Sequence, residues 1–229
     1  MNNVAEAARQ LSKGGIVIVY DGDEREGEAD MVFCAKFADA QKVRRLRKDG
    51  GGLICAAISG ESASRLNLPF LTDLLEANPS LKGLSCRKTA YGDKPAFSLQ
   101  VNHRNVFTGI TDNDRALTLS RLDEVVQDGA LSFEREFYSP GHVFLLIGSG
   151  LENRRGHTEL ALELGRLARH KGAMVLCEML GEGKALPKEE ARKYAEENGF
   201  AFLEGEDMLK REGEGIMAQK DENGIPEDD

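Results

Sequence analysis

Hydrophobic residues along the chain recur at the spacings of alternating helices and strands. Val4, Ala7, Ala8 and Leu11 fall at helical intervals, so they predict an amphipathic first helix that ends before the following glycine pair. Short apolar runs, either continuous or alternating with polar residues, predict strands. The strands predicted in this way are 16–20, 31–35, 53–58, 97–101, 143–147, 173–179 and 200–203.

Helices are predicted between these strands from capping residues as well as from spacing. Asp39 is the expected N-cap of a helix that ends at the glycines 50–52. Pro187 is expected to begin a helix that runs to Asn198, because proline suits the first helical turn and glycine suits the position after the last. The other predicted helices are 119–126, 158–170 and 206–210.

The order of these elements predicts how the chain is divided. Strands and helices are interleaved over residues 1–211, without a repeat or a Pro/Ser-rich linker, which predicts one layered α+β domain with helices packed on a sheet. Within it, residues 60–95 show no readable pattern because prolines and a glycine interrupt their short apolar runs. Residues 212–229 carry seven acidic residues and one basic residue, so we predict a disordered acidic tail.

Composition excludes several classes of protein. A hydrophobic content of 41% is enough for a core, yet no apolar run is long enough for a membrane span. The net charge of −9 argues against a nucleic-acid binder, which needs clustered basic residues. The chain begins without a secretory signal pattern, and its four cysteines form no C-x-x-C pair. We therefore predict reduced, buried thiols and a cytoplasmic location.

The first candidate site is the polar loop at residues 21–30, between two predicted strands. It contains six carboxylates around a single arginine, Arg25. Carboxylates that cannot spread apart on a short loop favour a hard cation such as Mg²⁺ or Mn²⁺, held together with substrate oxygens. An EF-hand does not fit, because Glu26 stands where the calcium loop needs glycine. The alternative interpretation is a solvated acidic turn that binds no ion.

The second candidate site is the stretch Arg154-Arg155-Gly156-His157-Thr158-Glu159, directly before an amphipathic helix. We predict Thr158 as the N-cap, and the free N–H groups of that helix end together with the two arginines suit a phosphate group. His157 lies among them as a possible metal ligand or proton carrier. The alternative is an ordinary capped helix start with a surface histidine.

Two further side chains are candidates for proton transfer. Glu178 ends the apolar run 173–177, where a carboxylate is costly to bury without a partner, so it is a candidate general acid or base. His142 stands at the beginning of a predicted strand. A glutamate that faces water at a strand end and a structural histidine are the alternative interpretations.

Five motifs, in this order along the chain, support a more specific interpretation. They are Asp21-x-Asp23-x-Arg25-Glu26-Gly27-Glu28-x-Asp30, Thr108-Gly109-Ile110-Thr111-x-x-Asp114-Arg115, Pro140-Gly141-His142-Val143, Arg154-x-Gly156-His157-Thr158-Glu159 and Cys177-Glu178. Together they resemble the 3,4-dihydroxy-2-butanone 4-phosphate synthase family of the riboflavin pathway. The resemblance extends from the first helix to about residue 210.

The resemblance implies a fold, a reaction and an assembly. The fold is a three-layer domain built on a mixed β-sheet. The reaction converts ribulose 5-phosphate to 3,4-dihydroxy-2-butanone 4-phosphate and formate, with two Mg²⁺ (or Mn²⁺) ions per site and no organic cofactor. The assembly is a homodimer whose sites draw on both subunits. Because the chain ends too soon for a fused GTP cyclohydrolase II domain, a monofunctional synthase is implied.

The resemblance also implies roles for individual residues. Glu26 and His157 would hold the metal, and His142 and Glu178 would be the essential acid/base pair. The substrate-binding residues would be Arg25, Glu26, Asp30, Thr111, Arg154, Arg155, Gly156, His157 and Thr158. One departure concerns Ser139, which stands where many members have arginine before Pro-Gly-His.

Two rival functions remain open at this stage. A non-catalytic module that binds a cation through the 21–30 loop would leave Arg154, His157 and Glu178 unexplained. A different sugar-phosphate enzyme, such as an isomerase, would stop at the enediol. Formate release distinguishes the synthase from an isomerase, and any turnover excludes the binding module.

Overall fold

Seven strands form one β-sheet in the computed structural model, which describes residues 3–85, 88–89, 92–128 and 131–210. They lie in the order β4-β5-β3-β6-β2-β1-β7. The pairs β3–β5 and β1–β7 are parallel and the others are antiparallel, which confirms the mixed sheet. The strands are β1 (Val17–Tyr20), β2 (Ala29–Cys34), β3 (Cys55–Ser59), β4 (Phe97–His103), β5 (Phe137–Gly148), β6 (Met174–Glu178) and β7 (Ala201–Glu204).

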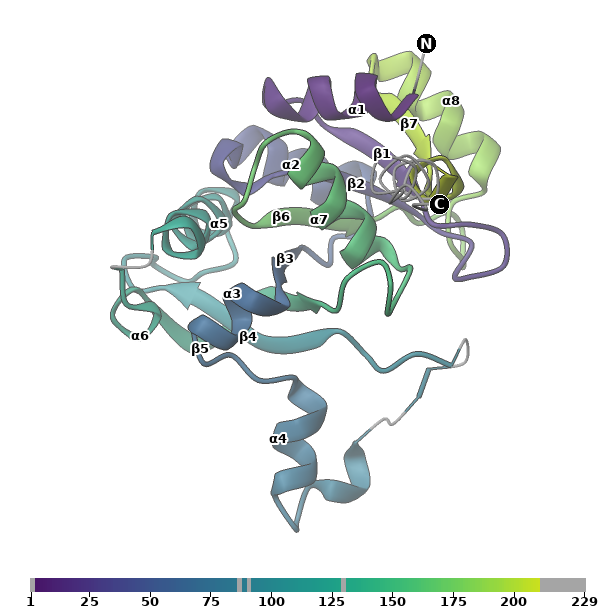
Figure 1. Ribbon diagram of the computed structural model, residues 1–229. Helices are drawn as coiled ribbons and strands as arrows, with labels where there is room; N and C mark the ends of the chain where they lie inside the picture. Colours follow the sequence, from purple (N-terminus) through teal and green to yellow (C-terminus); the bar gives the residue numbers. More distant parts are fainter. Residues whose placement is uncertain (1–2, 86–87, 90–91, 129–130, 211–229) are drawn as a thin grey trace, which may run out of the picture.

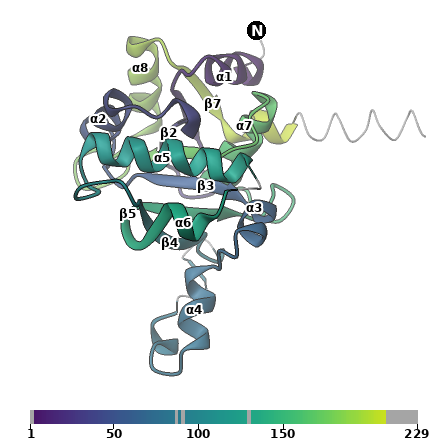
Figure 2. The ribbon, with the colours of Figure 1, turned by 90° about the vertical axis from the view of Figure 1, so that its left-hand side faces the viewer.

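Helices cover both faces of the sheet and complete three layers (Figures 1 and 2). α1 and α7 pack together on one face, while α2 and α8 lie on the other face, where α5 packs against α2. The helices are α1 (Asn3–Ser12), α2 (Ala40–Asp49), α3 (Gly60–Arg65), α4 (Leu71–Ala77), α5 (Asp112–Gln127), α6 (Phe133–Glu136), α7 (His157–Leu167) and α8 (Lys188–Asn198), with 3-10 turns η1 (Ala35–Phe37) and η2 (Lys82–Leu84).

The central strands are apolar because both of their faces are buried. Every residue of β1 and β2 is buried, and so are the first four residues of β3 and of β6. Polar residues occur where these strands end. In the register of β2 with β6, Asp30 lies opposite Glu178, and Asp30 also pairs with Val19 of β1. Two carboxylates that are far apart in the sequence are thereby brought to one end of the sheet.

Three elements extend beyond their predicted limits. α5 begins at Asp112 instead of residue 119, because Thr111 caps it by accepting the Asp114 N–H, and its first turn is too polar to show helical periodicity. β4 continues to His103, and β5 begins at Phe137, well before residue 143. These extensions pair with each other at the edge of the sheet. There the strands are less buried, so apolar and polar residues need not alternate regularly and the pattern used for prediction is lost.

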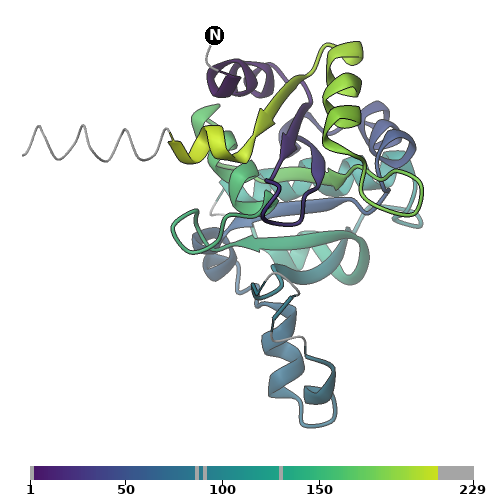
Figure 3. The ribbon, with the colours of Figure 1, turned by 90° about the vertical axis from the view of Figure 1, so that its right-hand side faces the viewer.

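The stretch 60–95, which shows no pattern in the sequence, contains α3, α4 and η2. α4 and η2 project from the end of the domain (Figures 1 and 3). The acidic tail lies outside the described residues, as does Cys86. The other three cysteines are buried and free, in agreement with the prediction of reduced thiols. Among the described residues, no helix is long and apolar enough to cross a membrane.

Candidate active site

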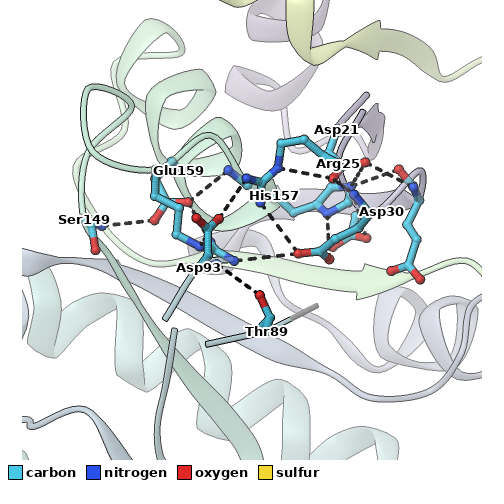
Figure 4. Close-up of polar contacts among 12 residues, drawn as sticks. Asp21, Arg25, Asp30, Thr89, Asp93, Ser149, His157 and Glu159 are labelled. Carbon is cyan, nitrogen blue, oxygen red and sulfur yellow. Dashed lines mark hydrogen bonds and ion pairs between the residues drawn. The ribbon is translucent and has the colours of Figure 1, made fainter. Parts of the chain in front are cut away.

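The acidic loop between β1 and β2 is folded around the buried carboxylate of Asp21. Its Oδ2 accepts the backbone N–H of Glu26 at 3.0 Å, and its Oδ1 accepts that of Glu28 at 3.1 Å. Gly27 between them has a φ of +68°, a conformation that favours glycine. Asp21 therefore satisfies two backbone N–H groups of the loop, and its side chain lies near Arg25, Asp30 and His157 (Figure 4).

His157, the first residue of α7, meets this loop. Its Nε2 lies 3.0 Å from the carbonyl oxygen of Glu28, which is a hydrogen bond that the ring N–H donates. That contact leaves Nδ1 with its lone pair, 4.0 Å from Oε2 of Glu26. Fixing one ring nitrogen on a carbonyl so that the other faces a carboxylate is the arrangement of a metal-binding histidine.

The described residues contain two groups of side chains whose ligand atoms lie close enough to hold a cation. Asp21, Glu26 and His157 form one, and Glu26, Glu28 and Glu178 form the other. Glu26 belongs to both. Oxygen donors with one imidazole suit Mg²⁺ or Mn²⁺, and a shared carboxylate is the means by which two neighbouring ions are held.

Burial, together with the charges around His157, shifts several pKa values in the site. Burial raises the pKa of Asp30 to about 7, although the charge of His157 opposes the shift. Burial also raises the pKa of Glu178, and Glu26 adds to that effect. For His157, burial lowers the pKa, but Asp30, Asp21 and Glu26 outweigh it, so the net direction is upward. Shifted pKa values of this kind are typical of functional sites.

Two arginines stand beside the carboxylates. Arg25 lies on the loop itself, with Nη2 3.7 Å from Oε1 of Glu26. Arg154, just before α7, has Nη2 3.8 Å from the same oxygen. Both guanidinium groups also contact the carboxylate of Asp93, which precedes β4. Two cations from separate parts of the chain therefore converge next to the candidate metal ligands (Figure 4).

The beginning of α7 is organised by Glu159, whose side chain is fully buried. Its Oε1 accepts the Ser149 N–H at 3.0 Å, and its Oε2 accepts Arg154 Nη1 at 2.7 Å and the Gly156 N–H at 3.2 Å. The N-cap of α7 is Gly156, so the prediction of Thr158 as the cap is wrong. Thr158 lies inside the first turn, where its backbone N–H has no partner within the helix.

A cavity connects these groups with the sheet. Its polar wall comes from the acidic loop and the start of α7, and its floor from residues of β3, β4, β5 and β6. The lining residues are Glu26, Asp30, Leu53, Cys55, Ala96, Phe97, Leu146, Arg154, His157, Thr158, Leu176, Cys177 and Glu178. An apolar floor beside carboxylates and cations is typical of a site for a small polar substrate.

Most of the predicted site residues meet here. Seven of them line the cavity or contact residues that line it: Arg25, Glu26, Asp30, Arg154, His157, Thr158 and Glu178. Gly156 contributes as the N-cap of α7, whereas Arg155 is exposed. Neither Thr111 nor His142 is among the described residues that line the cavity.

His142 lies on β5 and is held by Asn102 of β4. Its backbone N–H donates to Asn102 Oδ1 at 2.9 Å, and its Nδ1 lies 3.2 Å from Asn102 Nδ2. The neighbouring Gly141 is required because a Cβ there would lie 1.9 Å from the carbonyl carbon of Val101. The Pro-Gly-His motif therefore allows two strand backbones to approach closely and fixes the direction of the imidazole.

Sequence reasoning missed four residues that shape the site. Asp21 and Glu159 were quoted in the motifs but given no role of their own. For Glu159, the signal was its position three residues after the true N-cap, Gly156. Asp93 and Asn102 gave no local signal, since their partners lie far away in the sequence.

Comparisons with known proteins place the chain in a family. Residues 5–211 match the family described as 3,4-dihydroxy-2-butanone 4-phosphate synthase. The 3,4-dihydroxy-2-butanone 4-phosphate synthase of Methanothermobacter thermautotrophicus is 41% identical over 90% of this chain and 94% of that protein. The riboflavin biosynthesis protein RibBA of Bacillus velezensis is 31% identical over 90% of this chain, which spans 48% of that protein.

The same fold occurs in a solved structure of 3,4-dihydroxy-2-butanone 4-phosphate synthase in complex with two magnesium ions. The TM-score is 0.74 at 27% sequence identity, and the match covers 91% of this chain and 95% of the other. Similarity over nearly the whole length in both sequence and fold decides the family. This chain belongs to the 3,4-dihydroxy-2-butanone 4-phosphate synthase family and is an enzyme of riboflavin biosynthesis.

Proposed function

We propose that this enzyme converts ribulose 5-phosphate to 3,4-dihydroxy-2-butanone 4-phosphate and formate. The observation that carries the proposal is the convergence, in and beside one cavity, of candidate metal ligands, two arginines and Glu178. The reaction needs each of these: an enediol must be stabilised, a phosphate must be held, and protons must move at several carbons.

We propose Glu26 and His157 as the metal ligands, with two Mg²⁺ or Mn²⁺ ions and no organic cofactor. Mg²⁺ ligands lie at about 2.0–2.1 Å from the ion, so two ligands of one ion are separated by about 3–4 Å. The 4.0 Å between Glu26 Oε2 and His157 Nδ1 fits that range. When bound, the ions supply positive charge next to the oxygens of the enediolate.

The proposed phosphate seat is formed by Arg25, Arg154 and the first turn of α7. Guanidinium groups bind phosphate through paired hydrogen bonds, and a helix start adds free N–H groups and a partial positive charge. Thr158 lies in that turn and lines the cavity. Holding the phosphate there places the sugar carbons over the carboxylates and gives the flexible substrate one orientation.

Glu178 and His142 are proposed to move the protons. Burial raises the pKa of Glu178, which favours its protonated form, and this residue is proposed to act as a general acid and later as a base. Asp30 lies opposite Glu178 in the register of β2 with β6, and both residues line the same cavity. His142 is held rigidly by Asn102, as a group that must meet one substrate atom needs to be.

We propose that the enzyme is a homodimer in which His142 and Thr111 serve the site of the partner subunit. Support comes from exposed apolar side chains near them. Tyr138, which is bonded to Asn102, is partly exposed, and Phe107 is 95% exposed. Exposed aromatic residues around a functional motif indicate an interface. A second subunit would cover these side chains and bring His142 to a cavity. The proposed location is the cytoplasm.

One assay tests the reaction. The purified enzyme is incubated with ribulose 5-phosphate and Mg²⁺, and formate is measured. Stoichiometric formate supports the synthase, whereas isomerised pentulose without formate would mean that the enzyme stops at the enediol. Light scattering gives the mass in solution and tests the dimer. Mixing inactive His142→Asn and Glu178→Gln proteins tests site sharing, since mixed dimers would regain one intact site.

A further inference from the structure

Asp93 places one carboxylate oxygen between the two arginines of the proposed phosphate seat. Its Oδ2 lies 2.8 Å from Nη1 of Arg25 and 3.4 Å from Nε of Arg154. A single oxygen atom thus bridges guanidinium groups from the acidic loop and from the start of α7 (Figure 4). A bridging oxygen at such distances is what a phosphate group would supply in the same place.

The position of Asp93 is set by its own backbone. The Asp93 N–H donates to Oγ1 of Thr89 at 3.2 Å, and the Thr89 N–H donates to the Asp93 carbonyl oxygen at 2.8 Å. Asp93 itself is half-buried, with 27% of its side chain exposed. The Asp93 carboxylate therefore belongs to the segment before β4, which is separate from the acidic loop that carries Arg25 and from the start of α7 that carries Arg154.

We propose that the Asp93 carboxylate is a built-in competitor that the substrate phosphate must displace from Arg25 and Arg154. This inference rests on the proposed phosphate seat. A phosphate between these two guanidinium groups would lie against the Asp93 carboxylate, and like charges within about 4 Å repel in a partly buried site. A phosphate dianion gains more from two guanidinium groups than a single carboxylate does. Because an anion must displace Asp93 in order to bind the two arginines, phosphate dianions bind there in preference to simple carboxylates and chloride.

The opposite role would be that of a positioning residue, which holds the two arginines ready for phosphate. The two roles predict opposite changes in phosphate affinity when the charge of Asp93 is removed. If Asp93 competes, removing its charge strengthens phosphate binding. If it positions, removing its charge weakens binding, because the guanidinium groups lose the contact that orders them. Glu159 already holds Arg154 from the other side, which favours competition.

The test is phosphate affinity in Asp93→Asn, measured by titration calorimetry with inorganic phosphate on the intact protein. Loss of one charge-assisted hydrogen bond predicts binding that is tighter by about three- to tenfold. The KM for ribulose 5-phosphate should fall by a similar factor. Asp93→Glu keeps the charge and should stay within about twofold of the wild type. The matched control is Asp73→Asn, which breaks an exposed ion pair with Lys94 and should also leave phosphate affinity unchanged.

Unchanged or weaker phosphate binding in Asp93→Asn would overturn the proposal. Binding that tightens equally in Asp73→Asn would overturn it as well, because the gain would then come from net charge. If neither the wild type nor Asp93→Asn binds phosphate, the arginine pair is no anion seat and the inference fails. Formate release by the wild type still decides the proposed function separately.

Discussion

The Oε2 atom of Glu159 lies 2.7 Å from Nη1 of Arg154, and the Glu159 side chain is fully buried. The same carboxylate accepts two backbone N–H groups, from Ser149 and Gly156. It therefore joins the end of β5, the cap of α7 and a proposed phosphate ligand. A buried carboxylate with three donors is stable only as a complete network, so loss of one partner affects both the fold and the site.

Glu159→Gln should lower stability and substrate affinity together. The amide keeps one acceptor but turns an NH₂ group toward a former donor, so the expected loss is about 1–3 kcal/mol in the free energy of unfolding. Urea denaturation and the KM for ribulose 5-phosphate provide the measurements. Glu163→Gln, on the same helix and paired with Arg166, should change stability by less than about 0.5 kcal/mol. Equal effects of the two changes would contradict the network.

Gly141→Ala should destabilise the protein, although it adds only a methyl group. The new Cβ would lie 1.9 Å from the carbonyl carbon of Val101 and 2.3 Å from the backbone nitrogen of Asn102, so β4 and β5 must separate. Overpacking of this kind costs about 1–3 kcal/mol or more. Gly83→Ala meets nothing within 4 Å and is the control. A Tm for Gly141→Ala that equals the control's would show that the strands tolerate the contact.

How much of this molecule the sequence predicts depends on where each residue's partner lies. The apolar strands 16–20 and 173–179 were predicted correctly as β1 and β6, because burial on both faces leaves a continuous local pattern. The acidic loop and residues 154–158 were predicted as candidate sites from their charges and motifs. α5 was predicted too short, since its first turn is capped by Thr111 and carries no apolar periodicity.

The rest was inaccessible from sequence because it depends on long-range pairing. The contact of Asp93 with Arg25 joins positions 68 residues apart, and it comes from a stretch without readable periodicity. The apposition of Asp30 and Glu178 follows from the register of β2 with β6, which no local signal specifies. The placement of Gly156 as the N-cap required knowing that Glu159 turns back to it.

The affinity for Mg²⁺ should rise with pH through the neutral range. In the metal-free site burial lowers the pKa of His157, but the carboxylates around it outweigh burial and shift this pKa upward, so the imidazole keeps its proton to a higher pH than a free histidine does. Beside it, the pKa of Asp30 lies at about 7, so the negative charge next to the candidate ligands also grows as the pH rises. A metal ion needs neutral imidazole and ionised carboxylates, so it must displace those protons, and binding weakens as pH falls. Calorimetry between about pH 6 and pH 8, in buffers of different ionisation enthalpy, measures the proton release. Binding without proton release would contradict the prediction.

Turnover should require a divalent cation, and the requirement should depend on Glu26. Chelator treatment is expected to abolish formate release, and added Mg²⁺ or Mn²⁺ should restore it. Glu26→Gln should damage activity more than Glu24→Gln, because Glu26 belongs to both candidate ligand groups while Glu24 is exposed on the same loop. Full activity in the metal-free protein, or an equal loss of activity in the two variants, would contradict a catalytic metal site on this loop.

Glu178 and His142 should act in the chemistry and not in substrate capture. Neither carries the guanidinium group that a phosphate seat needs, and Glu178 ends a buried strand with a raised pKa. Glu178→Gln and His142→Asn are therefore expected to bind ribulose 5-phosphate as the wild type does, while turnover falls by about 10²–10⁴, the usual contribution of a positioned acid or base. Arg154→Ala should show the reverse pattern, with affinity lost first.

Calorimetric titration with ribulose 5-phosphate, alongside the formate assay, separates these patterns. Each variant gives one binding constant and one turnover number at saturation. A residue with a chemical role loses turnover and keeps affinity, whereas a residue with a binding role loses affinity and keeps turnover. If Glu178→Gln lost affinity while its turnover at saturation stayed normal, Glu178 would be a substrate ligand, and the proton would have to come from another buried acid. Asp30 is the candidate, because it faces Glu178 across β2 and β6 and its pKa lies at about 7.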